Sequence, residues 1–352
     1  MKRDPISPLQ GQFVTQPISQ DVLVEKYLKP GENSVDDLFA RVARALASVE
    51  AETERPKFEA IFLENLYAGA IGAGRIMSAA GTDIQATLIN CFVQPVGDCI
   101  QGMDGDGYPG IYEALREAAE TMRRGGGVGY DFSRIRPRGA AVKGTASMAS
   151  GPCSYINVFD QSCSTVESAG ARRGAQMGVL RIDHPDVLEF ITAKRTPGRW
   201  NNFNVSVGMT DSFMQALRND QAWELIHPAK PGAPLMSQGA YQRADGQWVY
   251  QTLPAQKLWD TVMKSTYDFA EPGILFLDNI NRDNNLNYCE TIAATNPCGE
   301  QPLPSYGCCD LGPIILPRFV RHAFGFAGVP MFDFEAFEKS VAIQVRALDN
   351  VL

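Results

Sequence analysis

The stretch TIAATNPCGEQPLPSYGCCDLG, residues 291–312, carries the most informative residues of the chain. At its centre, Asn296-Pro297-Cys298-Gly299-Glu300 places a cysteine on a tight turn between an amide and a carboxylate. The proline disfavours helical geometry at the residue before it, and the glycine leaves the backbone beside the thiol unobstructed. Amide, thiol and carboxylate can therefore point into one small volume, as hydrogen-bond donor, sulfur group and base. The alternative is a structural cysteine buried on a loop, a common role for an isolated cysteine.

Short apolar segments alternate with amphipathic segments in the part of the chain that leads to this stretch. The expected strands lie near residues 90–94, 178–182, 204–207 and 273–277. The expected helices between them lie near residues 109–122, 153–166 and 254–269. This alternation is typical of α/β units around a parallel sheet, so the predicted fold class is α/β.

The first part of the chain shows helical signals instead. Ser34 and Asp37 resemble a capping box at the start of an amphipathic helix. Pro56 suits the first turn of a following helix. The sequence therefore predicts a helical domain over residues 1–85 and an α/β domain over residues 86–352.

Composition excludes several classes of protein. An apolar content of 45% and a charged content of 20% are typical of a soluble globular chain. The net charge of −8 argues against a general binder of nucleic acid, and no long apolar run predicts a membrane span. The eight cysteines show no secreted disulfide framework, which favours reduced thiols in the cytoplasm. No Cys-x-x-Cys pair occurs, so no metal site is expected.

The last predicted helix carries an apolar stripe from Phe334 to Leu352, and no helix stop signal follows it. We therefore expect the chain to be truncated at its C-terminus relative to the complete protein.

The pattern Asn-x-Cys-x-Glu on a loop resembles the active-site signature of ribonucleotide reductases. The form NPCGEQPL, followed by Cys309 eleven residues after Cys298, resembles the adenosylcobalamin-dependent class II enzymes. The resemblance runs from about Gln16 to the C-terminus. It implies a helical domain followed by the first half of a ten-stranded α/β barrel, in which a central finger loop carries Cys298. The implied reaction is reduction of ribonucleotides, with diphosphates as the expected substrates.

The resemblance assigns the catalytic roles. Cys298 becomes the thiyl radical that takes the 3′ hydrogen, Glu300 accepts the 3′-OH proton, and Asn296 binds the ribose hydroxyls. Cys91 and Cys309 form the reducing pair, with Cys91 on the 2′ side. Such a pair requires α-carbons within roughly 7 Å of each other. Spacing alone would favour a buried structural cysteine at position 91, and it would not separate Cys309 from the adjacent Cys308.

Five substrate contacts are also implied by the resemblance: Asn90, Gly127, Ser150, Arg173 and Gln176. Gly127 would approach the substrate within a glycine run that could equally be a helix end and a tight connection. Arg173 and Gln176 would contact the base from a loop that could equally be a mobile surface connection. Ser150 precedes a helix start, where backbone N–H groups are available.

A basic cluster at residues 134–143 resembles the deoxynucleotide or ATP effector site that the family places at a dimer interface. Arg136 and Lys143 would hold phosphates there, and Asp98 would contact the base. The alternative is a solvated loop. The resemblance also implies a homodimer, adenosylcobalamin as cofactor, and thioredoxin or glutaredoxin as reductant. Two rival functions remain open: the large subunit of a metal-radical (class I) reductase, and a catalytically incomplete nucleotide-binding fragment.

Overall fold

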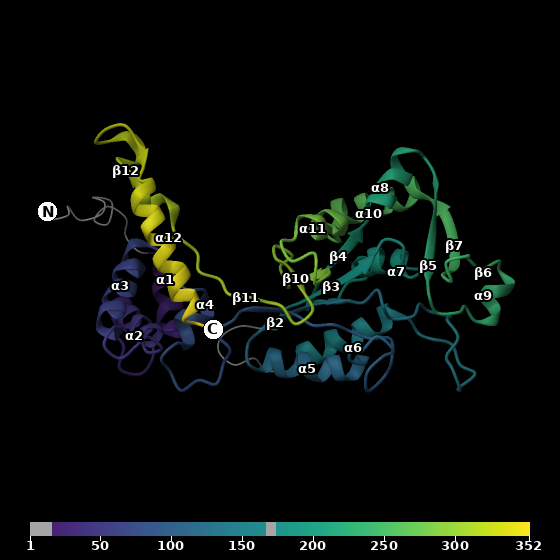
Figure 1. Ribbon diagram of the computed structural model, residues 1–352, viewed down its shortest axis with the longest axis horizontal. Coiled ribbons are helices and arrows are strands. Elements are labelled where there is room, and N and C mark those ends of the chain that lie inside the picture. Colours follow the sequence, from purple (N-terminus) through teal and green to yellow (C-terminus); the bar gives the residue numbers. More distant parts are fainter. Residues whose placement is uncertain (1–15, 167–173) are drawn as a thin grey trace. The chain divides into compact units, whose positions relative to one another are not determined.

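The computed structural model describes residues 16–166 and 174–352, which divide into two units (Figure 1). Residues 16–90 and 310–352 form one unit, and residues 91–166 and 174–309 form the other. Within the described ranges, no helix is both long enough and apolar enough to cross a membrane.

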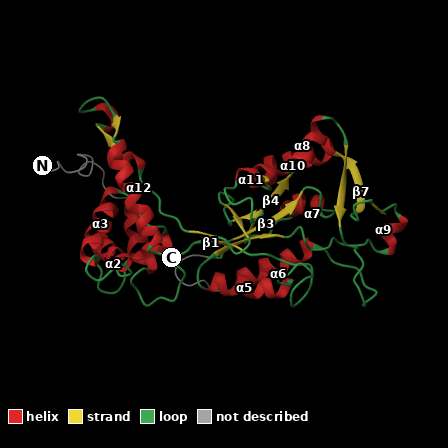
Figure 2. Cartoon of the chain, viewed as in Figure 1, coloured by secondary structure: helices red, strands yellow, loops and turns green. Residues whose placement is uncertain are grey.

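The first unit is mostly helical (Figure 2). Its helices enclose an apolar core. They are α1 (Pro17–Val22), η2 (Leu23–Tyr27), α2 (Val35–Ala47), α3 (Arg55–Ala68), α4 (Gly74–Ala79) and α12 (Phe334–Asp349). As predicted, the Ser34 hydroxyl accepts a hydrogen bond from the Asp37 backbone N–H, which caps α2. Between α4 and α12 in this unit lie η4 (Leu316–Phe319), β12 (Val320–Arg321), η5 (Ala323–Gly325) and β13 (Met331–Phe332).

A six-stranded sheet in the order β11-β1-β2-β3-β4-β8 forms the centre of the second unit. The strands are β1 (Cys91–Val93), β2 (Gly127–Asp131), β3 (Gln176–Arg181), β4 (Phe203–Met209), β8 (Gly273–Phe276) and β11 (Cys308–Cys309). β1, β2, β3, β4 and β8 run parallel, and β11 pairs antiparallel to β1. These parallel strands confirm the predicted half-barrel.

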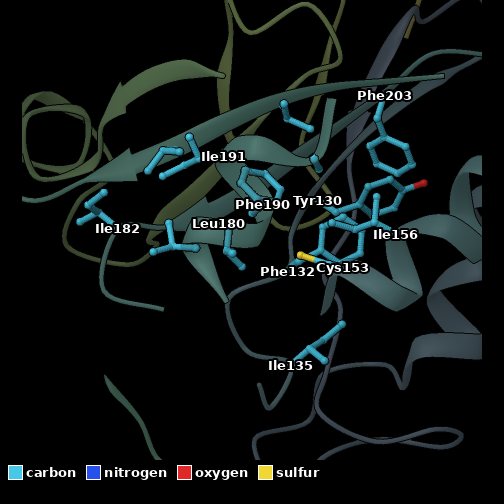
Figure 3. Packing of buried hydrophobic residues seen from close by; sticks show 14 of the residues in the cluster. Tyr130, Phe132, Ile135, Cys153, Ile156, Leu180, Ile182, Phe190, Ile191 and Phe203 are labelled. Atoms are coloured by element: carbon cyan, nitrogen blue, oxygen red, sulfur yellow. The ribbon is translucent and has the colours of Figure 1, made fainter. Parts of the chain in front are cut away.

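Helices pack on one face of this sheet. They are α5 (Ile111–Arg123), α6 (Pro152–Thr165), α7 (Val187–Thr192) with η3 (Ala193–Arg195), α8 (Asp211–Arg218) and α10 (Ala255–Phe269). Tyr130, Phe132 and Phe203 of the sheet region fill the core with Ile156 and Cys153 of α6 (Figure 3). Because side chains alternate along a strand, the residues between these core positions face the other side of the sheet. We call that side the finger-side face.

The finger is a hairpin of β9 (Ile292–Thr295) and β10 (Pro302–Pro304), joined by residues 296–301. It follows α11 (Leu277–Asp283), and it packs over β2 and β3. A separate sheet of β5 (Ala222–His227), β7 (Trp248–Pro254) and β6 (Tyr241–Gln242), with α9 (Ala233–Ser237), was not predicted from the sequence.

Candidate active site

The strand register gathers a row of residues on the finger-side face. Cys309 lies opposite Cys91, which lies beside Gly127 on the next strand. Two residues further along β2, Gly129 lies beside Met177 of β3, which in turn lies beside Asn204 of β4. Residues side by side in a register share one face, so these residues form a floor beneath the finger.

Cys91 and Cys309 form a thiol pair on this floor. Residues directly opposite in an antiparallel pair have α-carbons roughly 4.5–5.5 Å apart, which lies within the range that a disulfide needs. Both side chains are buried, with exposures of 3% and 8%, and neither is in a disulfide. The pKa of the Cys309 thiol is raised by its hydrogen bond with the Cys91 thiol, by burial and by the Glu300 carboxylate. The Cys309 thiol is therefore protonated at neutral pH.

Cys308 is excluded from this pair by the period of the strand. It lies opposite Phe92, one residue along from Cys309, and it is exposed. Successive side chains of a strand point to opposite faces, so Cys308 does not share the floor with Cys91.

The finger approaches the sheet closely because two floor positions are glycines. A β-carbon on Gly129 would lie 1.7 Å from the backbone oxygen of Thr295. One on Gly127 would lie 2.6 Å from Cγ of Pro297. Gly127 is thus brought to the predicted site, where it determines how close the finger lies.

Asn296 connects the finger tip to the thiol pair. Its side chain is fully buried, and its amide nitrogen donates to Sγ of Cys91 at 3.6 Å. The amide oxygen accepts from the Gln301 N–H at 2.9 Å, and the Asn296 N–H donates to the Gln301 carbonyl at 3.1 Å. These bonds join residues 296 and 301, the two ends of the tip that carries Cys298.

Cys298 and Glu300 both lie at the tip, and both are exposed. Gly299 between them has a φ of +87°, a left-handed conformation that favours glycine. An open hollow of about 820 Å³ adjoins Gly299 and Glu300, with Leu275, Ile280 and Ile292 among its apolar lining. Its described lining includes the amides of residues 279, 284 and 285 and contains no lysine or arginine.

Two predicted substrate residues are not brought to the cysteines. Gln176 faces the helices, because it precedes Met177 in β3 and the two side chains point to opposite faces. It is only 1% exposed, and its amide binds the Tyr130 hydroxyl (3.0 Å) and the Phe159 carbonyl (3.1 Å). Ser150 is exposed ahead of α6, beyond the carboxyl end of β2, whereas Cys91 and Gly127 begin their strands.

The other two predicted substrate residues have different outcomes. Asn90 is 7% exposed beside Cys91, and its Oδ1 has no hydrogen-bond partner among the described residues. Arg173 lies outside the described residues.

The predicted effector residues Asp98 and Arg136 lie together beyond the carboxyl ends of β1 and β2. The Arg136 guanidinium binds the Asp98 carboxylate at 3.0 Å and the Ala141 carbonyl at 3.0 Å. Lys143 is exposed on the same loop. A sugar separates the base of a nucleotide from its phosphates, so Asp98 and Arg136 cannot serve opposite ends of one effector while they remain paired.

Two buried histidines support this loop. His184 Nε2 and His227 Nε2 bind the carbonyls of Ile135 (3.0 Å) and Arg134 (3.2 Å). Each Nδ1 accepts a backbone N–H, from Asp186 and Ala229 respectively. Burial lowers the pKa of His184 to about 3 and of His227 to about 4, so both rings are neutral at neutral pH.

Three floor residues were missed in the sequence: Gly129, Met177 and Asn204. Met177 Cε lies 3.4 Å from where a β-carbon on Gly299 would be, and the Asn204 amide donates to the Pro297 carbonyl at 2.8 Å. Asn204 could have been found from the alternation of side chains along its strand, because it is a polar residue within a mostly apolar segment. Across the described ranges, no three His, Cys, Asp or Glu side chains gather as a metal site.

Comparison with known proteins identifies the family. The all-alpha domain of ribonucleotide reductase matches residues 14–85, and the barrel domain matches residues 89–352. A vitamin B12-dependent ribonucleoside-diphosphate reductase from Mycobacterium tuberculosis is 35% identical over 344 residues, which is 94% of this chain and 45% of that protein. A protein of the same name from Thermoplasma acidophilum is 36% identical over 274 residues, 78% of this chain and 32% of that protein.

A ribonucleoside-diphosphate reductase large subunit from Arabidopsis thaliana is 30% identical over 270 residues, 72% of this chain and 31% of that protein. The chain thus spans less than half the length of these three relatives. Since the matched domains cover both units of the fold, the chain belongs to the ribonucleotide reductase family.

Proposed function

We propose that this chain supplies the thiol chemistry of a ribonucleoside-diphosphate reductase that makes deoxyribonucleotides for DNA synthesis. The observation that carries the proposal is the opposed pair Cys91 and Cys309 beneath a finger that presents Cys298 between Asn296 and Glu300. The substrate phosphate level, diphosphate, follows the names of the relatives.

The chemistry proceeds through groups that the site supplies. Removal of the 2′-OH becomes feasible once C3′ of the ribose carries a radical. The Cys298 thiyl radical forms it by taking the 3′ hydrogen, and Cys298 later returns that hydrogen to C3′. Glu300 accepts the 3′-OH proton as general base. Asn296 orients the sugar, which reduces the entropy cost of reaction.

The pair Cys91 and Cys309 supplies two electrons and two hydrogens. The 2′ oxygen leaves as water after Cys91 protonates it, and the two sulfurs join as a disulfide. The raised pKa of Cys309 supports this role, because a thiol that stays protonated can deliver hydrogen.

We propose adenosylcobalamin as the cofactor, following the vitamin B12-dependent relatives. The cofactor, when bound, would initiate the radical at the protein. Cys298 is exposed, and an open hollow adjoins the next two residues of the chain, Gly299 and Glu300, which supports an initiator that arrives from outside the sheet. The ring nitrogens of His184 and His227 are both taken by backbone groups, so neither offers a ligand to cobalt.

The remaining assignments are proposals of the same kind. Thioredoxin or glutaredoxin would reduce the disulfide, and a deoxynucleotide or ATP effector would bind a homodimer at Arg136 and Lys143. Such an effector would draw Arg136 away from Asp98. We also propose the division into a helical domain (1–85) and a barrel part (86–352), within which residues 310–352 return to the helical unit.

The test is reduction of ADP and CDP by the polypeptide extended to the length of its relatives, with dithiothreitol as reductant. We expect deoxynucleotide formation that requires adenosylcobalamin. Activity that instead requires a separate metal-radical subunit would establish the class I alternative. Nucleotide binding with no reduction under either condition would establish the nucleotide-binding alternative and refute the proposal.

A further inference from the structure

Asn204 binds the peptide that leads into Cys298. Its amide nitrogen, on the finger-side face of β4, donates to the carbonyl oxygen of Pro297 at 2.8 Å. That carbonyl belongs to the peptide unit between Pro297 and Cys298. The hydrogen bond therefore acts one peptide bond away from the α-carbon that carries the thiol.

The finger tip rests on the floor through contacts of two kinds. Gly127 and Met177 lie against Pro297 and Gly299 through van der Waals contact, which limits how closely the tip approaches the sheet. Such contacts leave the peptide plane free to rotate, because they have little directional preference. A hydrogen bond prefers a donor aligned with the carbonyl, so Asn204 fixes the rotation that the packing leaves open.

The carbonyl also depends on this donor for its own stability. Pro297 is buried, Asn204 is exposed, and the hydrogen bond between them is part-buried. A part-buried carbonyl that loses its protein partner carries a desolvation penalty unless it turns to meet water. Without Asn204, the tip would gain free energy by turning this carbonyl toward water, and the turn would move Cys298 with it.

We propose that Asn204 is a positioning residue for Cys298, acting through the Pro297 carbonyl to hold the thiol in one orientation above the Cys91–Cys309 pair. Its catalytic consequence rests on the proposed function, whereas its effect on the finger tip does not. Misplacement of a reacting atom by about 1 Å lowers a rate by about 100-fold. Loss of the bond should therefore lower kcat by about 10- to 100-fold and leave KM nearly unchanged.

The variants are Asn204→Leu, which removes the donor, and Asn204→Asp, which keeps the shape but offers no N–H. Asn202→Leu is the matched control. The Asn202 amide also donates to a backbone carbonyl, that of Asp160 at 3.2 Å, but that bond leads to α6 rather than to the finger. Asn204→Gln retains an amide donor, so its loss of tip order and of kcat should be smaller than in the two variants without a donor.

The first readout is hydrogen exchange of the tip amides in the chain itself. Gly299 N–H donates to the Asn296 carbonyl, and Gln301 N–H donates to the Asn296 side chain. A net loss of about 1 kcal/mol for one hydrogen bond corresponds to about fivefold faster exchange at these amides. We expect this change in both donor-less variants and none in Asn202→Leu. Unchanged exchange in a folded Asn204→Asp protein would overturn the proposal.

The second readout is steady-state kinetics in the extended polypeptide. A fall in kcat at constant KM supports the positioning role, and an unchanged kcat despite faster exchange overturns its catalytic part. If the unsubstituted polypeptide reduces no ribonucleotide, the proposed function fails, and the exchange measurement still decides whether Asn204 orders the tip.

Discussion

Replacing Gly129 by alanine should displace the finger and abolish most activity. The added β-carbon would stand 1.7 Å from the Thr295 carbonyl oxygen and 2.9 Å from its carbonyl carbon. Both are backbone atoms, so no side-chain rotation relieves the clash. An ordinary carbon–oxygen contact lies near 3.3 Å, which requires a shift of the finger of about 1.6 Å.

The expected consequence follows from that distance. A misplacement of about 1 Å costs about 100-fold in rate, so kcat of the extended polypeptide should fall by at least about 100-fold. Overpacking of this kind also costs about 1–3 kcal/mol of stability, and a thermal melt would measure that loss separately.

Two further glycines calibrate the experiment. Gly127→Ala would meet Cγ of Pro297 at 2.6 Å and the Ala175 backbone oxygen at 3.2 Å, a milder clash than at Gly129, and should have a smaller effect. Gly178→Ala, on the helix side of β3, would meet its nearest neighbours at 3.5 Å, an ordinary contact, and should leave kcat unchanged. Activity of Gly129→Ala within about threefold of the unsubstituted protein would refute the derivation of the finger position from this contact.

Three other predictions follow from the site. Cys298→Ala should abolish turnover of the extended polypeptide and leave effector affinity, measured by calorimetry, intact; retained turnover would remove Cys298 from its role. Arg136→Ala should weaken binding of deoxynucleoside triphosphates by about 10-fold or more while the basal rate holds; a lost basal rate with normal affinity would contradict the effector assignment. Because burial lowers the pKa of His184 to about 3 and of His227 to about 4, the unfolded chain binds protons below pH 6.5 that the folded chain does not. The free energy of unfolding should therefore fall as pH drops from 6.5 to 4, and His227→Gln should flatten that dependence by up to about 1.4 kcal/mol per pH unit in urea titrations; an unchanged slope would show that His227 is not kept neutral.

The strands β1, β3, β4 and β8 of the parallel sheet and the turn at Cys298 could be predicted from the sequence, whereas β2 was missed because it begins in a glycine run. Apolar segments of strand length alternate with helical segments, and the proline and glycine beside Cys298 indicate a turn there. The sheet of β5, β7 and β6 was missed because its strands are partly exposed and show no clean apolar run.

Which residues form the site depends on the pairing register of the strands, and the register could not be predicted from the sequence. Gln176 and Met177 are neighbours, yet one faces the helices and the other faces the finger, and a shift by one residue would exchange them. The same parity separates Cys309 from Cys308. Asn204 stands out as a polar residue within β4, but its partner Pro297 lies 93 residues later in the sequence. Local sequence patterns do not predict a contact at that separation.

The most direct test is the connectivity of the cysteines after a single turnover without external reductant. The extended polypeptide would be mixed with substrate and adenosylcobalamin, quenched by alkylation and mapped by mass spectrometry. A disulfide between Cys91 and Cys309, formed in proportion to deoxynucleotide and absent in Cys298→Ala, is the predicted result. Deoxynucleotide formed while both thiols remain alkylatable, or a disulfide through Cys308 instead, would contradict the assignment of the reducing pair.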